Sequence, residues 1–385
     1  METSNLSMLP LDIIRSLLER LSFIDLQRAK TVCSNWLSGS KETVPCKTGS
    51  PWLILSTDNG GSVLYNPDED KVYKSLRDYS GTCFFANSGK WFLLLDSQTN
   101  LYIVDVFSDK RIDLPPLENL LSTTYTIERV GDKEFKRKHI DGVSSLTLRA
   151  DVLRGLLWVD EKKEDYIVVY FFDTPAAYLS FCKKGDDYYT DIPLRSGVPK
   201  LLIGLTDVVL RDYCLYIFSY RCYVRVLDLS GQKGFVDVSE SVPYHMRSPR
   251  TPYFSNTSIA VTRAGEVLLV ESITTGSHVS FYVYKKDPNV VPLSDPHRLV
   301  EVHSLGDEAL LLDLGITVPA NHDSLGVIKP NSIYFTRHDR ARLRKSYNLD
   351  ISVFDFASKT IKHFPGLSNL NLKDARWFLP VTCQT

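Results

Sequence analysis

Short runs rich in Val, Ile, Leu, Tyr and Phe alternate with tight turns along almost the whole chain after Pro45. The clearest stretch is residues 82–114, in which four such runs are separated by turns at 87–89, 97–100 and 108–109. Branched and aromatic residues favour strands, and turns this short favour antiparallel pairing of the strands that they join. Residues 82–114 therefore predict a four-stranded antiparallel meander.

The grouping in fours recurs along the sequence. Further quartets of β-rich runs lie at about 144–192, 204–238, 257–303 and 308–363. The quartets begin about 50 to 65 residues apart, which is typical of the four-stranded blades of a β-propeller. In the quartet at 144–192, the first strand is expected at residues 145–150 (SLTLRA).

Two segments at the ends of the β-rich region remain. Residues 52–76 supply three runs, and residues 377–380 supply one more. Together they predict a blade that is closed by both ends of the domain, so that no sheet edge is left open. We therefore expect an all-β propeller over residues 50–382, with six four-stranded blades favoured over five or seven. A row of β-sandwiches is the alternative fold.

The first forty-odd residues follow a helical period instead. In residues 9–21 (LPLDIIRSLLERL), Pro10 suits the first helical position, Asp12 suits the first turn, and the apolar residues form one wide stripe. A second helix is expected from residue 22, where a capping-box pattern begins, and a third from residue 34. The segment predicts a small all-α domain of three helices.

Three helices of this size carry more large apolar side chains than they can bury among themselves. A chain of about forty residues is also near the lower limit for folding unaided. The excess apolar surface is explained either by a helical cap packed on the following β domain or by a docking face for helices of another protein. Spacing alone does not separate these two explanations.

One motif runs through the whole helical segment. It reads Leu9-Pro10-x-Asp12, then Leu18-x-x-Leu21, Asp25-Leu26-x-Arg28-Ala29 and Val32-Cys33-x-x-Trp36. In its residues and their spacing this motif resembles an F-box, here over residues 6–45. F-boxes bind a Skp-type adaptor, which links them to a cullin and a ubiquitin-conjugating enzyme. The resemblance implies that the adaptor-facing surface or its support is built by Leu9, Pro10, Ile13, Ile14, Leu17, Leu18, Leu26, Val32 and Trp36.

Six short segments of the β-rich part carry a second resemblance. They are Leu64–Pro67, Ser88–Trp91, Leu305–Leu310, Pro330–Phe335, Val353–Phe356 and Trp377–Pro380. They resemble a plant-specific family in which an F-box precedes a degenerate propeller, catalogued as domain of unknown function 295. The resemblance covers nearly the whole chain, and it implies a protein that delivers target proteins for ubiquitination. It does not identify the target.

Composition and missing motifs exclude several classes of function. A formal net charge of −1 argues against a general nucleic-acid binder. Seven widely spaced cysteines without a C-x-x-C pair predict no metal site, and they indicate reduced thiols in a cytoplasmic or nuclear protein. No apolar run is long enough to cross a membrane. Nucleotide-binding and nucleophile motifs are missing, so neither a cofactor nor a catalytic residue is expected.

Two basic runs have more than one explanation. The first is Lys133–His139, and the second, Arg337–Lys345, holds Arg337, Arg340, Arg342, Arg344 and Lys345. Both are expected in loops. Solvated insertions would explain them, and so would a nuclear import signal or a patch for an acidic or phosphorylated substrate.

We therefore expect a non-catalytic substrate-recognition subunit of a Skp–cullin–F-box ubiquitin ligase, in which the propeller holds an unknown protein target. Two alternatives stay open. One is a β-propeller enzyme or carbohydrate-binding protein whose helices are only a cap. The other is a nucleic-acid-binding protein that uses Arg337–Lys345, with an affinity that falls steeply with salt.

Overall fold

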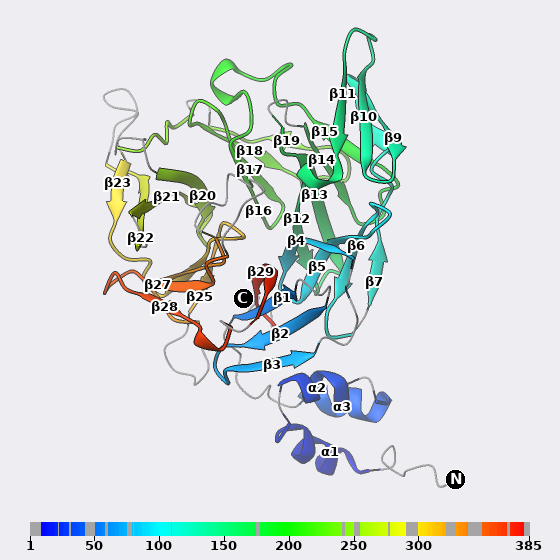
Figure 1. The fold of residues 1–385 in the computed structure, drawn as a ribbon, viewed down its shortest axis with the longest axis vertical. Coiled ribbons are helices and arrows are strands. Elements are labelled where there is room, and N and C mark those ends of the chain that lie inside the picture. Colours follow the sequence, from blue (N-terminus) through cyan, green and yellow to red (C-terminus); the bar gives the residue numbers. More distant parts are fainter. Residues whose placement is uncertain are drawn as a thin grey trace.

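The structure is a computed structural model of the full chain. It describes residues 9–21, 23–30, 32–42, 51–57, 61–74, 79, 81–108, 110–174, 178–240, 243–249, 255–275, 278–289, 299–320, 328–337, 349–367 and 370–380. Figure 1 shows three helices at one end of the molecule, next to strand β3, and a large body of sheets arranged around a common centre.

The N-terminal helices are α1 (Leu11–Leu18), α2 (Phe23–Ala29) and α3 (Ser34–Glu42). Pro10 was expected at the first helical position, but it lies one residue before the helix, with an extended backbone at φ −56° and ψ 146°. Its carbonyl oxygen accepts the first helical hydrogen bond from Ile14 N at 3.0 Å. Pro10 therefore acts as the N-cap residue, where a missing N–H also costs nothing.

Five groups of strands in the β body form four-stranded antiparallel runs. The strands of the first three groups are β29 (Leu372–Phe378), β1 (Trp52–Thr57), β2 (Ser62–Asn66), β3 (Lys71–Lys74); β4 (Cys83–Ser88), β5 (Trp91–Leu95), β6 (Leu101–Asp105), β7 (Arg111–Asp113); and β12 (Leu153–Asp160), β13 (Asp165–Phe172), β14 (Tyr178–Lys183), β15 (Tyr189–Ile192). The other two groups are β16 (Asp207–Arg211), β17 (Cys214–Phe218), β18 (Val224–Asp228), β19 (Val236–Asp237); and β20 (Ser255–Val261), β21 (Val267–Thr275), β22 (His278–Lys286), β23 (Leu299–Val302). The short strand β8 (Leu120–Leu121) pairs in parallel with β15.

The first group joins the two ends of the β domain, as expected from the sequence. Strand β29 pairs antiparallel with β1, with Trp377 opposite Leu53, and Leu53 is in turn opposite Tyr65 of β2. The C-terminal strand is longer than the expected 377–380, because it starts at Leu372.

The quartet expected at 144–192 is wrong in its first strand. Residues 145–149 form β11 (Ser145–Arg149), which pairs with β10 (Glu134–His139) and, through it, with β9 (Tyr125–Gly131) in a separate three-stranded sheet. The first strand of the quartet is β12, which follows a 3-10 turn at Ala150–Val152. Gly155 interrupts the apolar pattern of β12, and a Cβ there would lie 2.6 Å from Leu93 Cδ2. Close packing against β5 therefore requires a glycine at this position.

The last quartet also differs from the expected meander. An additional strand, β25 (Ile316–Pro319), forms a hairpin with β24 (Glu308–Leu311), and Gly315 closes their turn with φ +68°. Strand β24 then pairs in parallel with β26 (Ser332–Phe335), which continues to β27 (Ser352–Asp355) and β28 (Ile361–His363). One parallel pair, Val261 with Ile316, joins β25 to β20 and so links two groups in one nine-stranded sheet.

Apolar side chains join each group of strands to the next, in a closed cycle. Each two neighbouring groups share one buried cluster; the pairs of cluster members from the two groups include Ile54 and Phe92, Leu93 and Leu157, Ile167 and Val208, Val209 and Ile259, Ala260 and Ile333, and Val353 and Leu53. The last pair returns to the first group. A row of β-sandwiches would leave its terminal sheets apart, whereas a propeller brings them together.

Candidate functional site

The helical segment has a small core of its own. Ile14 and Leu18 of α1 pack with Leu26 and Ala29 of α2, and all four side chains are at most 5% exposed. Leu9, Leu21 and Trp36 pack against this cluster and are partly buried. Helix α3 approaches α1 closely because of Gly39, where a Cβ would lie 2.9 Å from Ile14 Cγ2.

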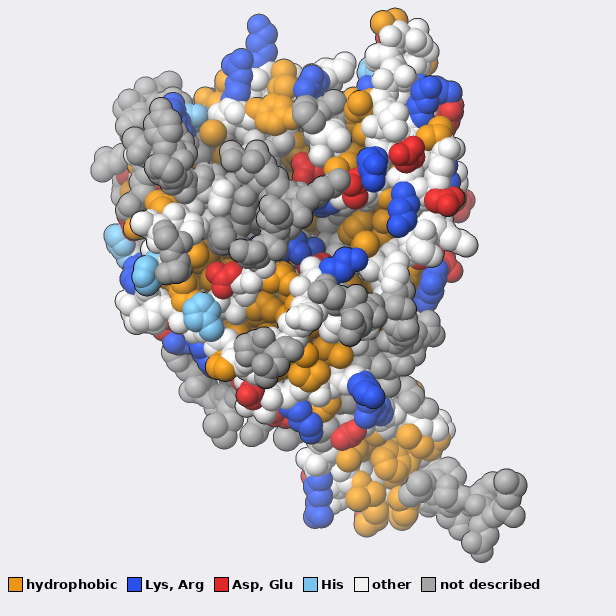
Figure 2. Space-filling view, in the orientation of Figure 1, with side chains coloured by type: hydrophobic (Ala, Val, Ile, Leu, Met, Phe, Trp, Pro, Cys, Tyr) orange, Lys and Arg blue, Asp and Glu red, His pale blue; other side chains and the backbone are white. Residues whose placement is uncertain are grey.

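Large apolar side chains on the outside of the same helices are not covered by the β domain. They are Leu11 (43% exposed), Ile13 (46%), Leu17 (40%), Val32 (57%) and Leu37 (42%). Pro10, Ile13 and Leu17 follow the spacing of one helical face and are all exposed, and Figure 2 shows hydrophobic side chains gathered over these helices. We call Pro10, Leu11, Ile13, Leu17, Val32 and Leu37 the apolar helical surface. A surface of this kind marks a protein interaction site.

The nine residues expected to form or support a docking face fall into three classes. Pro10, Ile13, Leu17 and Val32 are exposed, Leu9 and Trp36 are half-buried, and Ile14, Leu18 and Leu26 are buried in the helical core. Leu11 and Leu37 belong to the exposed class but were not expected from the sequence. The helical period would have placed Leu11 with Ile14 and Leu18, and only the structure shows that its side chain is exposed.

A group of charged side chains in the β domain lies near the end of α2. Lys90 forms ion pairs with Asp105 at 3.1 Å and with Glu161 at 3.3 Å, and Trp91 Nε1 donates a hydrogen bond to Glu161. Lys30, just after α2, lies near this group. Burial and the charge of Lys90 lower the pKa of Lys30, and the two carboxylates oppose this shift. The end of α2 therefore lies within electrostatic range of the start of β5, while the apolar helical surface stays open.

Enlarging Gly39 should loosen the helical segment alone. A Gly39→Val change places methyl groups against Ile14, and overpacking of this kind costs about 1–3 kcal/mol. We expect faster amide hydrogen exchange in α1 and α3 and unchanged exchange in the β strands. The matched control is Ser38→Val, because Ser38 is an exposed neighbour on the same helix. Equal exchange in the two variants would contradict the close packing of α1 on α3.

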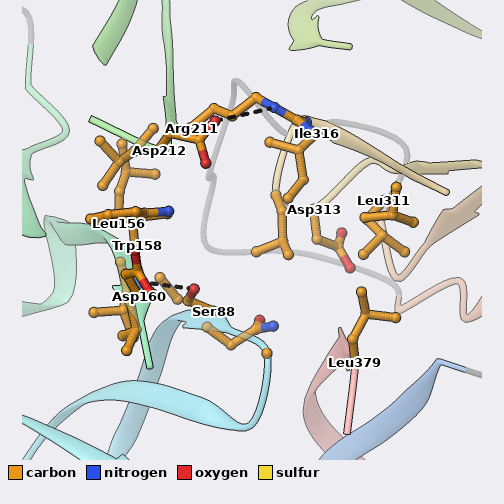
Figure 3. A pocket seen from close by; sticks show the side chains of 18 of the residues that line it. Ser88, Leu156, Trp158, Asp160, Arg211, Asp212, Leu311, Asp313, Ile316 and Leu379 are labelled. Atoms are coloured by element: carbon orange, nitrogen blue, oxygen red, sulfur yellow. Dashed lines mark hydrogen bonds and ion pairs between the residues drawn. The ribbon is translucent and has the colours of Figure 1, made fainter. Parts of the chain in front are cut away.

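A second candidate site is a cavity of about 620 Å³ near the centre of the β domain. It is lined from β4, β12, β16, the β24–β25 hairpin and the end of β29, and Figure 3 shows its labelled side chains around a common space. Its walls are partly apolar, with Leu156, Trp158, Leu311, Ile316 and Leu379 among them. Five basic residues line it against three acidic ones, so the wall carries a positive excess.

One of the acidic residues, Asp313, is tied into the wall. Its carboxylate accepts hydrogen bonds from the backbone and the hydroxyl of Thr336. Burial raises the pKa of Asp313, and the nearby guanidinium groups of Arg376 and Arg337 oppose this shift. A smaller cavity of about 260 Å³ shares Asp313, Arg376 and Gly155 with the first, so the two cavities adjoin.

The first basic run does not lie in a loop as expected, and of the five basic residues named in the second run the structure describes Arg337 alone. Lys133–His139 lies mostly in strand β10, and Arg137 is only 4% exposed, with its guanidinium stacked 3.7 Å from the ring centre of Tyr178. In the second run, the Arg337 side chain is 12% exposed and pairs with Asp374. Arg340, Arg342, Arg344 and Lys345 lie outside the described residues. A charged strand can thus be stabilised by aromatic stacking, which the charge pattern alone does not reveal.

Neither a metal-binding cluster nor a membrane-spanning helix occurs in the described part of the chain. No cluster of three or more His, Cys, Asp or Glu residues suited to a metal ion occurs among the described residues. The described helices are also too short and too polar to span a bilayer.

Comparisons with known proteins match both parts of the chain. The F-box domain profile matches residues 6–42, and the KIB1-4 beta-propeller profile matches residues 64–355. The F-box protein At5g25290 of Arabidopsis thaliana is 49% identical over 390 residues, covering 97% of this chain and 96% of that protein. F-box protein At2g14290 is 49% identical over 386 residues with 97% of each covered, and F-box protein KIB4 is 34% identical over 398 residues, with 97% and 95% covered; both are from Arabidopsis thaliana.

Proposed function

The chain belongs to the family of plant F-box proteins with a C-terminal KIB1-4 β-propeller, and from this premise we propose that it is the substrate-recognition subunit of a Skp–cullin–F-box ubiquitin ligase. F-box proteins generally act as substrate receptors of such ligases, as non-catalytic subunits. The same proposal places the protein in the cytoplasm or the nucleus.

The apolar helical surface is the observation that carries this proposal. Its members Ile13, Leu17 and Val32 are 40–57% exposed, although the β domain lies beside the helices and could have covered them. A helical cap would turn its apolar side chains toward the domain that it covers. In our proposal the apolar helical surface contacts the Skp-type adaptor, Ile14, Leu18 and Leu26 support it from inside, and Leu9 and Trp36 lie at its border.

The propeller is proposed to hold the target protein. We propose six blades, namely the five antiparallel groups of four strands and the group of β24, β26, β27 and β28, into which the hairpin strand β25 is inserted. A receptor of this kind accelerates ubiquitin transfer by raising the effective concentration of target lysines near the activated ubiquitin. The mechanism needs no reactive side chain in this chain.

The rival functions receive less support. Two of the three carboxylates at the large cavity have structural partners: Asp160 accepts hydrogen bonds from the backbone of Lys162 and Lys163, and Asp313 accepts them from Thr336. A glycosidase would instead need a pair of carboxylates that flank the scissile bond. The net charge of −1 gives no attraction to nucleic acid.

Reconstitution tests the proposal directly. We expect the full chain, co-expressed with a Skp-type adaptor, to elute as a 1:1 complex in size-exclusion chromatography with light scattering. Addition of a cullin should extend this complex to a ternary one. A chain that is folded by circular dichroism but elutes apart from the adaptor would overturn the proposal.

A further inference from the structure

The cavity of about 620 Å³ has the size of a small-molecule site, since such sites typically span about 300–1,000 Å³. All of its lining residues belong to the β domain and none to the apolar helical surface, so adaptor docking does not explain it. Figure 3 shows Leu156 and Trp158 on one side of the space and Leu311, Ile316 and Leu379 on the other. An apolar ring or chain would fit between these two walls.

Asn87 supplies a polar group in the same wall that has no hydrogen-bond partner among the described residues. Its side chain is 3% exposed, and neither its amide nitrogen nor its amide oxygen forms a hydrogen bond. Leaving a buried polar group unpaired costs about 1–3 kcal/mol for each group. In native structures, an amide of this kind typically forms its hydrogen bonds with a ligand or an ordered water molecule. Asn87 therefore offers one donor and one acceptor to an occupant of the cavity.

Arg211 supplies a positive charge that the protein neutralises only in part. Its Nη1 donates to the carbonyl oxygens of Val261 at 3.2 Å and Thr317 at 2.9 Å, which fix its position but carry no charge. Its Nε is buried without a hydrogen bond, and the ion pair with Asp212 is 4.0 Å long to a carboxylate that is 74% exposed. Desolvation by burial lowers the pKa of Arg211. An anion beside Arg211 would complete its charge balance.

We propose that this cavity binds a small organic anion with an apolar body, in which the apolar part packs between Trp158 and Ile316, a polar group pairs with the Asn87 amide, and the anionic group lies near Arg211. The site would make the propeller a receptor for a small molecule in addition to its role toward a target protein. This proposal does not depend on adaptor binding.

Two dyes that differ in one anionic group test whether the cavity prefers an anionic ligand. The dye 8-anilinonaphthalene-1-sulfonate has a naphthalene ring system, a phenyl ring, an N–H group and a sulfonate, and N-phenyl-1-naphthylamine is the same molecule without the sulfonate. The titrations use the full chain with Ile13→Glu and Leu17→Glu, which makes the apolar helical surface polar and removes dye binding there. We expect fluorescence titration to give one site for the sulfonate dye and at least about tenfold weaker binding of the neutral dye, since each tenfold step corresponds to about 1.4 kcal/mol.

Two substitutions in this background test the location. Ile316→Trp fills the cavity and should abolish binding of the sulfonate dye, while Asn87→Leu removes the amide at similar volume and should weaken binding at least about tenfold. Without dye, Asn87→Leu should melt at the same temperature or higher, because it removes two unpaired polar groups. Val143→Trp, on a residue that is 84% exposed far from the cavity wall, is the control with unchanged affinity.

Three results would overturn the proposal. The first is equal affinity of the sulfonate dye for the background protein and for Asn87→Leu, and the second is neutral-dye binding as tight as that of the sulfonate. The third is a lower melting temperature of dye-free Asn87→Leu, which would make the amide a structural group. Each of these is measured on a variant with conserved side-chain volume or on the background protein, so none depends on whether Ile316→Trp folds.

Discussion

Replacing Ile13 and Leu17 together by glutamate should abolish binding to a Skp-type adaptor and leave the folded protein intact. The two side chains are 46% and 40% exposed, one turn apart on α1, and they take no part in the buried helical core. Burying a side chain of this size stabilises a complex by about 1.5–3 kcal/mol, and burying a carboxylate in its place carries a further penalty. The adaptor affinity should therefore fall more than about 100-fold, as measured by isothermal titration calorimetry.

The matched control carries two glutamates at exposed apolar positions of the β domain. Ile140→Glu with Val143→Glu changes residues that are 58% and 84% exposed in the connection between β10 and β11. This variant should bind the adaptor as the wild type does. Equal loss of adaptor binding in both variants, or retention in the helical variant, would show that the apolar helical surface is not the contact. A changed melting temperature in the helical variant would show that the two residues stabilise the fold.

Helix periodicity could locate the docking face but could not divide it into contact and core. Ile13, Ile14, Leu17 and Leu18 form one wide apolar stripe in the sequence, and successive residues on a helix are about 100° apart. Which half of the stripe is covered depends on where α3 lies, and that depends on the close approach at Gly39. A single glycine in a short helix gives no signal of its packing partner before the fold is known.

The strand pattern predicted most of the propeller, and it failed where strands carry charge or glycine. Strand β10 reads EFKRKH, a pattern that predicts a loop, because the packing of Arg137 against an aromatic ring is a long-range contact that the pattern does not contain. Strand β12 was missed because Arg154 and Gly155 interrupt it, although Gly155 is required by the approach of Leu93. The local pattern contains only the side chains of one strand. The side chains that pack against such a strand and stabilise it come from segments remote in sequence.

No signal in the sequence predicted the central cavity. Asn87 was expected in a turn at 87–89, because Asn, Ser and Gly are turn formers. Strand β4 instead continues through Ser88, with Asn87 opposite Phe92 of β5, and the turn begins at Gly89. An unpaired amide can be recognised only when all of its neighbours are known, since the same residue is fully solvated in a turn.

Replacing Trp377 by alanine should destabilise the whole β domain, because this residue lies where the two ends of the domain meet. Its side chain is 1% exposed, and its indole N–H donates to the carbonyl oxygen of Phe335 at 3.0 Å. The ring also makes edge contacts with Tyr334 and Phe364, at centroid distances of 5.3 and 5.6 Å. Truncation of a buried tryptophan costs about 3–5 kcal/mol, so we expect the melting temperature to fall by on the order of 10 °C.

The loss should be global, because β29 supplies the strand that joins the last group to the first. Trp377 lies in one buried cluster with Leu53 of β1 and Val353 of β27, so its removal weakens the packing of both groups at once. We expect one shifted transition in calorimetry, and faster hydrogen exchange in β1 and β27 as well as in β29. Lys373→Ala, at an exposed position of the same strand, should melt as the wild type does. Trp377→Ala could instead speed exchange in β29 alone, while the other strands keep their exchange rates. That result would show that the propeller is stable without its closing strand, and that the terminal pairing contributes little to the stability of the β domain.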